Sequence, residues 1–163
     1  MTALESRLAR IEARTEIIDL MHSYCRAADR LDPSAMLAHF IDRCRVSYVV
    51  GAAWMDKAML AEMLDTYLPN TVSSQHMITN EEIIFLSDDE AILHTYMYSW
   101  QRYRDFPMRS DTHRFGRYER RVARGAAGWR FTHMLLVSAG ELGEPRIGEQ
   151  LARPWPPVFE AAA

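Results

Sequence analysis

The stretch Pro69-Asn-Thr-Val-Ser-Ser-Gln-His76 decides the fold, because the periodicity of the chain changes there. Before it, apolar residues recur at helical spacing, and Pro69 with the asparagine after it ends the last helical pattern. After it, segments rich in β-branched and aromatic residues alternate with turn residues. These segments are predicted strands of an antiparallel sheet, and they cover residues 72–86, 90–103, 111–124 and 128–138.

The region before Pro69 is predicted to be mostly helical. A long amphipathic helix is expected over residues 4–28, a short helix over 34–40 with Asp32 as its N-cap, and a third helix over 56–68. One strand is expected over 43–50. Helices followed by strands predict an α+β fold, in which N-terminal helices pack on one face of a curved antiparallel sheet and close it into a cone.

Length and composition indicate one globular domain. The chain has 163 residues, of which 48% are hydrophobic and 25% charged, so it can bury a sizeable core. We expect the α+β cone domain over residues 1–138 and an irregular C-terminal extension over 139–163, which contains several prolines. The extension is expected either to cover a pocket or a neighbour, or to be a mobile terminus.

The charge balance favours a small-molecule ligand. With 19 basic and 22 acidic residues, the net charge of −3 gives no reason to expect nucleic acid or a membrane surface as a partner. The first residues lack the apolar core of a signal peptide, and no apolar run reaches the length of a membrane span. Cys25 and Cys44 are too few for a disulfide framework. A cytoplasmic location is therefore expected.

Asp29, near the end of the first helix, and His76, on a predicted strand, are the candidate acid–base pair. Imidazole moves protons near neutral pH, and a carboxylate behind it fixes its tautomer and stabilises its charged form. Asp32 fits the N-cap of the next helix better than Asp29 does, so Asp29 is expected to face a pocket. On composition alone, a structural histidine in the core is the more common role for a lone histidine on a strand.

Three short motifs carry a family resemblance: Tyr24-x4-Asp29-x2-Asp32, the strand that bears His76, and Gly116-Arg-Tyr-Glu-Arg-Arg121 before Gly128-Trp-Arg-Phe131. With these motifs the chain resembles the SnoaL-like branch of the cystatin-like cone fold over roughly residues 11–137. Scytalone dehydratase, bile-acid dehydratase and hexachlorocyclohexane dehydrochlorinase are relatives in that branch. The resemblance therefore implies a cone-shaped domain that binds a small molecule.

The resemblance also implies roles for single residues. Asp29 and His76 match the catalytic pair of the family, and Tyr48 matches a pocket tyrosine that polarises the substrate carbonyl. Tyr24 is expected to be either a pocket hydrogen-bond donor or a core aromatic residue. Arg117 matches a pocket arginine of the dehydrochlorinase, although the arginines of this strand could equally be solvated or paired with Glu119.

A substrate-binding wall is predicted from the period-two alternation of two strands. Tyr96, Tyr98 and Trp100 share a face of one strand, and His113 and Phe115 share a face of the next. This wall suits a flat hydrophobic ligand, and it suits a subunit interface equally well. The alternation alone does not tell which face of the sheet is inside.

Trp100 stands where scytalone dehydratase has a second catalytic histidine, which favours the single Asp/His pair of the dehydrochlorinase as the nearer model. No metal or cofactor is expected, because the six histidines show no local ligand spacing. His94, His113 and His133 could overturn this expectation by meeting across adjacent strands.

Together these features predict a cofactor-independent lyase, a dehydratase or related elimination enzyme, for a small hydrophobic cyclic or aromatic substrate. Isomerisation or ring closure would use the same residues. A non-catalytic ligand-binding or assembly subunit, like the β-subunit of ring-hydroxylating dioxygenases, is the alternative from another class. The resemblance implies a homodimer or homotrimer, with the first helix and the exposed aromatics as contacts.

Overall fold

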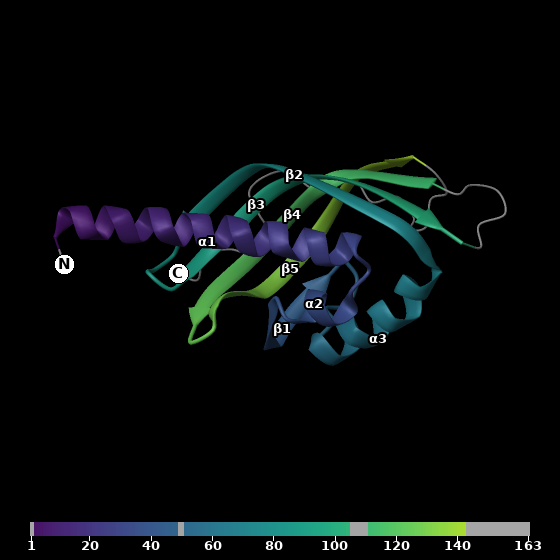
Figure 1. Ribbon diagram of the computed structural model, residues 1–163, viewed down its shortest axis with the longest axis horizontal. Coiled ribbons are helices and arrows are strands. Elements are labelled where there is room, and N and C mark those ends of the chain that lie inside the picture. The colour runs from purple at the N-terminus through teal and green to yellow at the C-terminus, as the bar shows by residue number, and fades with distance from the viewer. Residues whose placement is uncertain (1, 49–50, 105–110, 143–163) are drawn as a thin grey trace.

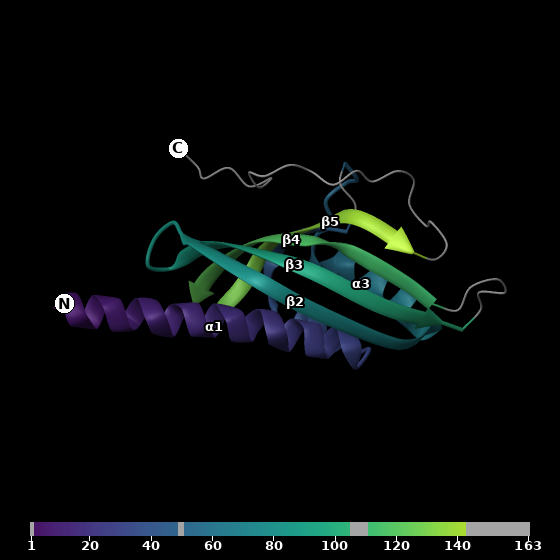
Figure 2. The same ribbon diagram turned by 90° about the horizontal axis from the view of Figure 1, so that it is seen from above.

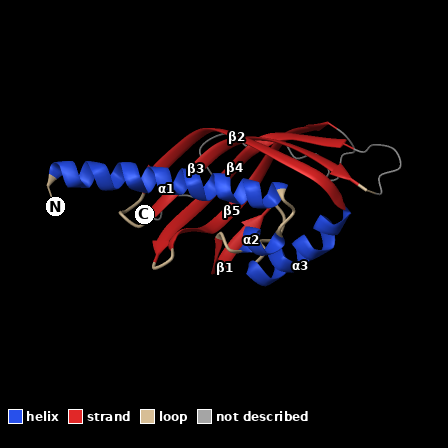
Figure 3. Cartoon of the chain, in the orientation of Figure 1, coloured by secondary structure: helices blue, strands red, loops and turns tan. Residues whose placement is uncertain are grey.

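The computed structural model describes residues 2–48, 51–104 and 111–142. Helices precede the long strands along the chain, as Figure 3 shows, which confirms the α+β class. The helices are α1 (Ala3–Asp29), α2 (Pro33–Leu37) and α3 (Lys57–Tyr67), with a 3₁₀ turn at Leu68–Asn70. The strands are β1 (Phe40–Ser47), β2 (Thr71–Phe85), β3 (Glu90–Tyr103), β4 (Asp111–Gly125) and β5 (Gly128–Leu142).

The sheet is curved and open, with the strand order β1-β5-β4-β3-β2. Strands β2 to β5 are antiparallel neighbours, as predicted. Strand β1 instead pairs in parallel with β5, so the antiparallel prediction does not hold at this edge. The helices lie on one side of the sheet, with α1 running along it and α3 packed against β1 (Figures 1 and 2). This arrangement is the predicted cone.

Helix α1 is longer than the part that packs on the sheet. It begins at a capping box in which Thr2 and Glu5 bond to each other's backbone N–H groups. Its buried face consists of Ala13, Ile17, Leu20, Met21, Tyr24, Cys25, Ala27 and Ala28. The first turns extend beyond the sheet (Figure 1), which leaves Leu4, Leu8 and Ile11 between 53% and 74% exposed. The exposed turns are thus available to a partner.

The junction between α1 and α2 gives Asp29 and Asp32 different positions. Asp29 is the last residue of α1, and Leu31 turns the chain with a positive φ of 55°. The side chain of Asp32 then accepts a hydrogen bond from the Ala35 N–H at 2.9 Å and caps α2. The prediction that Asp32 is the cap is confirmed, and Asp29 is left for another contact.

A bulge in β2 keeps its apolar side chains on the core side. The register with β3 shifts between Thr79 and Glu82, and Asn80 has a positive φ of 57°. Ile78 before the bulge, and Ile83 and Phe85 after it, all pack on the core although their numbers differ in parity. Strict alternation would have turned the residues after Asn80 away from the core.

The last strand is longer than predicted. Strand β5 continues to Leu142, past the expected boundary at Ser138, because residues 140–142 still pair with β4. The remainder of the predicted C-terminal extension, 143–163, lies outside the described residues. Within the described ranges, none of the helices combines the length and apolar character needed to cross a membrane.

Replacing Gly116 by alanine is expected to destabilise the sheet. A Cβ atom at Gly116 would lie 2.3 Å from the carbonyl oxygen of Val137 on β5, so the two strands would have to separate. We expect the free energy of unfolding, measured by urea denaturation, to fall by about 1–3 kcal/mol. Gly125→Ala is the matched control, since a Cβ there meets nothing within 4 Å. Equal losses in the two variants would contradict the close approach at Gly116.

Candidate active site

A cavity of about 400 Å³ lies between the helices and the concave face of the sheet. Its apolar lining includes four methionines: Met36, Met55, Met63 and Met97. Its polar lining includes Tyr24, Tyr48, Ser74, His76, Ser99, Gln101, Tyr103 and Arg114. A mostly apolar cavity with a few polar groups is typical of a small-molecule site.

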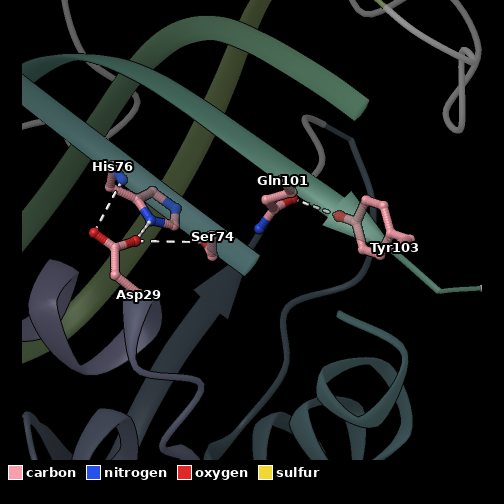
Figure 4. Close-up of polar contacts among 5 residues, drawn as sticks. All are labelled: Asp29, Ser74, His76, Gln101 and Tyr103. Carbon is pink, nitrogen blue, oxygen red and sulfur yellow. Dashed lines mark hydrogen bonds and ion pairs between the residues drawn. The ribbon is translucent and has the colours of Figure 1, made fainter. Parts of the chain in front are cut away.

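Asp29 and His76 are hydrogen-bonded to each other at this cavity (Figure 4). The Nδ1 atom of His76 lies 2.7 Å from Oδ1 of Asp29, and the two side chains are 10% and 27% exposed, respectively. The contact joins the last residue of α1 to β2, which are packed against each other. The contact inferred from the sequence is therefore present in the structure.

Two further donors hold the Asp29 carboxylate in place. The backbone N–H of His76 donates to Oδ2 at 3.1 Å, and the Ser74 hydroxyl donates to Oδ1 at 3.4 Å (Figure 4). Because a carboxylate oxygen accepts, the proton of a neutral His76 ring belongs on Nδ1. The second ring nitrogen, Nε2, is then an unprotonated base available to a molecule in the cavity.

Tyr24 and Tyr48 form a second polar group at the same cavity. Their hydroxyl oxygens lie 2.7 Å apart, and the Tyr24 ring packs edge-on against Phe40 and Phe131. The ring of Tyr24 thus lies in the core and its hydroxyl at the cavity, while its role as a donor to a ligand stays a prediction. Burial raises the pKa of Tyr48 to about 12 and that of Tyr24 well above its ordinary value. Both hydroxyls keep their protons near neutral pH. One proton lies in the bond between them, so the pair has one O–H left to donate to a ligand.

Arg117 does not lie at the cavity, which corrects the prediction from the sequence. It lies on the opposite face of β4, where its Nε is 3.3 Å from Oε1 of Glu119. The face that turns inward carries Arg114, Tyr118 and Arg120. Tyr118 and the apolar Val122 share this parity, and that pattern could have identified the inner face from the sequence.

The predicted aromatic wall also lies on the outer face. The side chains on the cavity side of β3 are Met97, Ser99 and Gln101, so residues of the other parity point away from the cavity. The residues affected by this correction are Tyr96, Tyr98, Trp100, His113 and Phe115, none of which lines the cavity. Tyr98 and His113 bond to each other at 2.6 Å on that outer face. A subunit contact, the other role considered for this wall, stays a prediction.

Sequence reasoning missed two polar contacts among the cavity residues. Gln101 and Tyr103 of β3 are hydrogen-bonded to each other (Figure 4). Arg114 lies on β4 three residues before Arg117 and bonds through Nε to the carboxylate of Glu141 on β5. Arg114 is a cation in the cavity lining, which is the role expected of Arg117.

The three histidines that could have met across strands do not converge. His94 bonds to Glu82, His113 to Tyr98, and His133 to the neighbouring Thr132. Among the residues that the structure describes, no group of three or more His, Cys, Asp or Glu side chains is arranged to hold a metal ion. Cys25 and Cys44 are both buried free thiols.

Comparison with known families decides the classification. The model of the SnoaL-like domain matches residues 9–135, which span α1 through most of β5. The chain belongs to the SnoaL-like domain family. A search of the curated proteins gave no significant match.

Solved structures share the fold of this SnoaL-like chain. A protein provisionally assigned as a scytalone dehydratase from Novosphingobium aromaticivorans is 21% identical, with a TM-score of 0.78 over 90% of this chain and 95% of the other. A provisionally assigned aromatic ring hydroxylase from the same organism is 25% identical, with a TM-score of 0.69 over 77% and 88% of the two chains. Hexachlorocyclohexane dehydrochlorinase from Novosphingobium barchaimii is 16% identical, with a TM-score of 0.72 over 91% and 99%.

The orientation of the His76 ring gives a spectroscopic prediction. Because Nδ1 bonds to Asp29, we expect the ¹⁵N chemical shifts of neutral His76 to show a protonated Nδ1 and an unprotonated Nε2. In an Asp29→Ala variant this tautomer preference should be lost. A His76 ring protonated on Nε2 in the unmodified protein would contradict the assigned geometry.

Proposed function

We propose that this SnoaL-like protein is a cofactor-independent lyase that eliminates water or a related leaving group from a small hydrophobic, cyclic or aromatic substrate. The observation that carries the proposal is the Asp29–His76 pair at the same cavity as the Tyr24–Tyr48 pair. One pair supplies a base, and the other supplies a donor for an oxygen that becomes negative. Both are needed to remove a proton from a carbon next to a carbonyl group.

In the proposed reaction, Nε2 of His76 takes the proton from the carbon next to the carbonyl group. The electron pair of that C–H bond moves toward the carbonyl oxygen, which accepts a hydrogen bond from the free O–H of the tyrosine pair. The enolate then forms the new carbon–carbon double bond, and the leaving group departs with its electron pair. For loss of water, the imidazolium returns its proton to the departing hydroxide, so the enzyme ends unchanged.

Asp29 acts on the ring rather than on the substrate. It holds the Nδ1–H tautomer and stabilises the imidazolium that forms when Nε2 takes the proton, without accepting that proton itself. Arg114 is proposed in place of Arg117 as the cation that faces developing or departing negative charge, because Arg114 lines the cavity. Trp100 is not proposed as a substrate-binding residue, because it lies on the outer face of the sheet.

Isomerisation and ring closure begin with the same proton transfer, and they remain proposed alternatives to elimination. A non-catalytic role as a binding or assembly subunit predicts no proton transfer at all. The polar pairs favour the enzyme, because a subunit that only assembles has no need of a base and a tyrosine donor at one cavity. A cytoplasmic location remains part of the proposal.

Proton abstraction can be tested without knowing the natural substrate. We expect the protein to exchange the α-hydrogens of some cyclic ketones for deuterium in D₂O, followed by NMR. His76→Gln should slow this exchange by about 10²–10⁴-fold, which is the usual contribution of a general base. His113→Gln is the matched control, because that histidine lies on the outer face of the sheet. No exchange above the solvent rate with any ketone, or equal rates in both variants, would count against the lyase.

We further propose that the chain self-associates through α1, on the side of the helix that faces away from the sheet. Leu4, Leu8, Ile11 and Ile18 have the spacing of a and d positions in a heptad repeat, on the side away from the buried face. Glu5, Glu12 and Asp19 flank this seam on one side, and Arg7 and Arg14 flank it on the other. A parallel pair of α1 helices from two copies would place acidic flanks against basic flanks, whereas an antiparallel pair would oppose like charges.

A charge placed in this seam is expected to dissociate the oligomer. Leu8→Glu buries a carboxylate in the proposed contact, and we expect light scattering to show a smaller mass at micromolar concentration. Ala9→Glu adds the same charge at an exposed position that follows Leu8 in sequence but lies outside the seam, and it should keep the mass of the unmodified protein. A monomeric unmodified protein, or an unchanged mass for Leu8→Glu, would show that α1 is not the interface.

A further inference from the structure

Arg120 is a fully buried arginine on the inner face of β4. One guanidinium nitrogen, Nη1, donates to the Thr95 hydroxyl at 3.1 Å, while Nε and Nη2 are buried without a hydrogen-bond partner in the described part of the chain. Arg120 forms no ion pair with any described carboxylate. A buried charge normally has a partner of opposite sign, because leaving water costs several kcal/mol.

Aromatic rings separate Arg120 from the cavity. The guanidinium carbon lies 3.8 Å from the ring centre of Tyr118 and 5.4 Å from that of Phe131. Tyr118 lines the cavity, and Phe131 packs against Tyr24, which also lines it. These cation–π contacts replace part of the lost solvation, but they bring no negative charge.

The ionisable groups around Arg120 are three phenol hydroxyls and a thiol. They are Cys25 and Tyr24 of α1, Tyr48 after β1, and Tyr118 of β4. Burial raises the pKa of all four, and the charge of Arg120 partly opposes that rise. All four are therefore neutral near pH 7, and the positive charge has no anion among them. An anion in the cavity would be the missing partner.

We propose that Arg120 is the counter-charge for an anionic oxygen of the ligand, so the cavity takes molecules that bind as a phenolate or enolate at the Tyr24 and Tyr48 hydroxyls. The ligand class follows from the site: an apolar cavity accepts a ring, the hydroxyl pair donates one hydrogen bond to its oxygen, and the guanidinium behind the aromatic layer favours the ionised form. This inference deepens the proposed function and rests on it for the use of the same cavity.

Arg120 is thus a positioning residue for charge rather than a group that touches the substrate. Its charge is in place before the substrate arrives, and the rings of Tyr118 and Phe131 pack against it. Arg114, at the cavity itself, is already paired with Glu141. Of these two arginines, Arg120 is the one that forms no ion pair with a described carboxylate.

Substituted nitrophenols test the proposal, because their ionised and neutral forms absorb at different wavelengths. The unmodified protein should bind a nitrophenol more tightly as the pH rises through the pKa of the free phenol, and the bound spectrum should be that of the phenolate. The bound phenol should have a pKa about one unit or more below its value in Arg120→Met. Weaker binding on ionisation in the unmodified protein would overturn the proposal without any variant.

Arg121→Met is the matched control, since Arg121 follows Arg120 on β4 and therefore points to the other face. It removes the same charge and should leave the bound phenol ionised, whereas equal shifts in both variants would overturn the specific role of Arg120. If Arg120→Met does not fold, Arg120→Lys keeps the charge and should preserve phenolate binding. A neutral phenol bound to a folded Arg120→Lys would contradict the proposal.

Phenolate binding can be tested independently of the lyase reaction. Phenolate binding needs no turnover, so it should persist in His76→Gln, in which deuterium exchange is expected to be lost. Loss of the phenolate preference in folded His76→Gln would assign the effect to His76 and overturn the role of Arg120. Phenolate binding by a protein that exchanges no ketone hydrogens would support Arg120 and contradict the lyase.

Discussion

The hydrogen bond between Asp29 and His76 ties the end of α1 to β2, and the candidate site depends on it. It exists because α1 ends at Asp29 and because Asp32, not Asp29, caps the next helix. The chain turn at Leu31 separates the two carboxylates, so Asp32 caps α2 while Asp29 bonds to His76, which lines the cavity. A local event at a helix end thereby positions a base that is distant in sequence.

The polar groups of the cavity are divided between the two edges of the sheet. His76 lies on β2 at one edge, while Tyr48 follows β1 at the other edge, and the residues of α1 bond to both. Curvature of the sheet lets both edges face the same cavity. A flat sheet of the same strands would keep these groups apart, so the shape of the sheet is part of the chemistry.

Local periodicity predicted the helices and the long strands well, because apolar spacing and turn residues are properties of neighbouring residues. It predicted the cap at Asp32 for the same reason. The parallel pairing of β1 with β5 depends on residues far apart in sequence, and no local pattern indicated it. The predicted end of the last strand fell short of Leu142 because Gly140 and the prolines after it indicated an irregular segment.

The errors at the site have one physical origin, which is the assignment of strand faces. Aromatic side chains at Tyr96, Tyr98 and Trp100 suggested a ligand wall, but the cavity side of β3 carries smaller residues such as Ser99, which leave space for a ligand. On β4 the same misassignment selected Arg117 instead of Arg114. Which face is inside depends on packing against helices, so alternation within one strand does not determine it.

The proposed mechanism uses one charge to stabilise positive charge at the cavity and another to stabilise negative charge there. Asp29 stabilises positive charge on His76 when the ring takes a proton, and Arg120 behind the tyrosines favours negative charge on a ligand oxygen. Proton transfer from a carbon acid to a base creates both charges at once. The two buried features are therefore complementary, although they lie on different elements of the fold.

The most direct test of this account is a crystal structure of the protein with a bound cyclic ketone. We expect the ketone oxygen to contact the Tyr24 and Tyr48 hydroxyls. The acidic carbon beside it should lie about 3–3.5 Å from Nε2 of His76. A ketone bound in the cavity with that carbon turned away from His76, or with its oxygen far from both tyrosines, would contradict it.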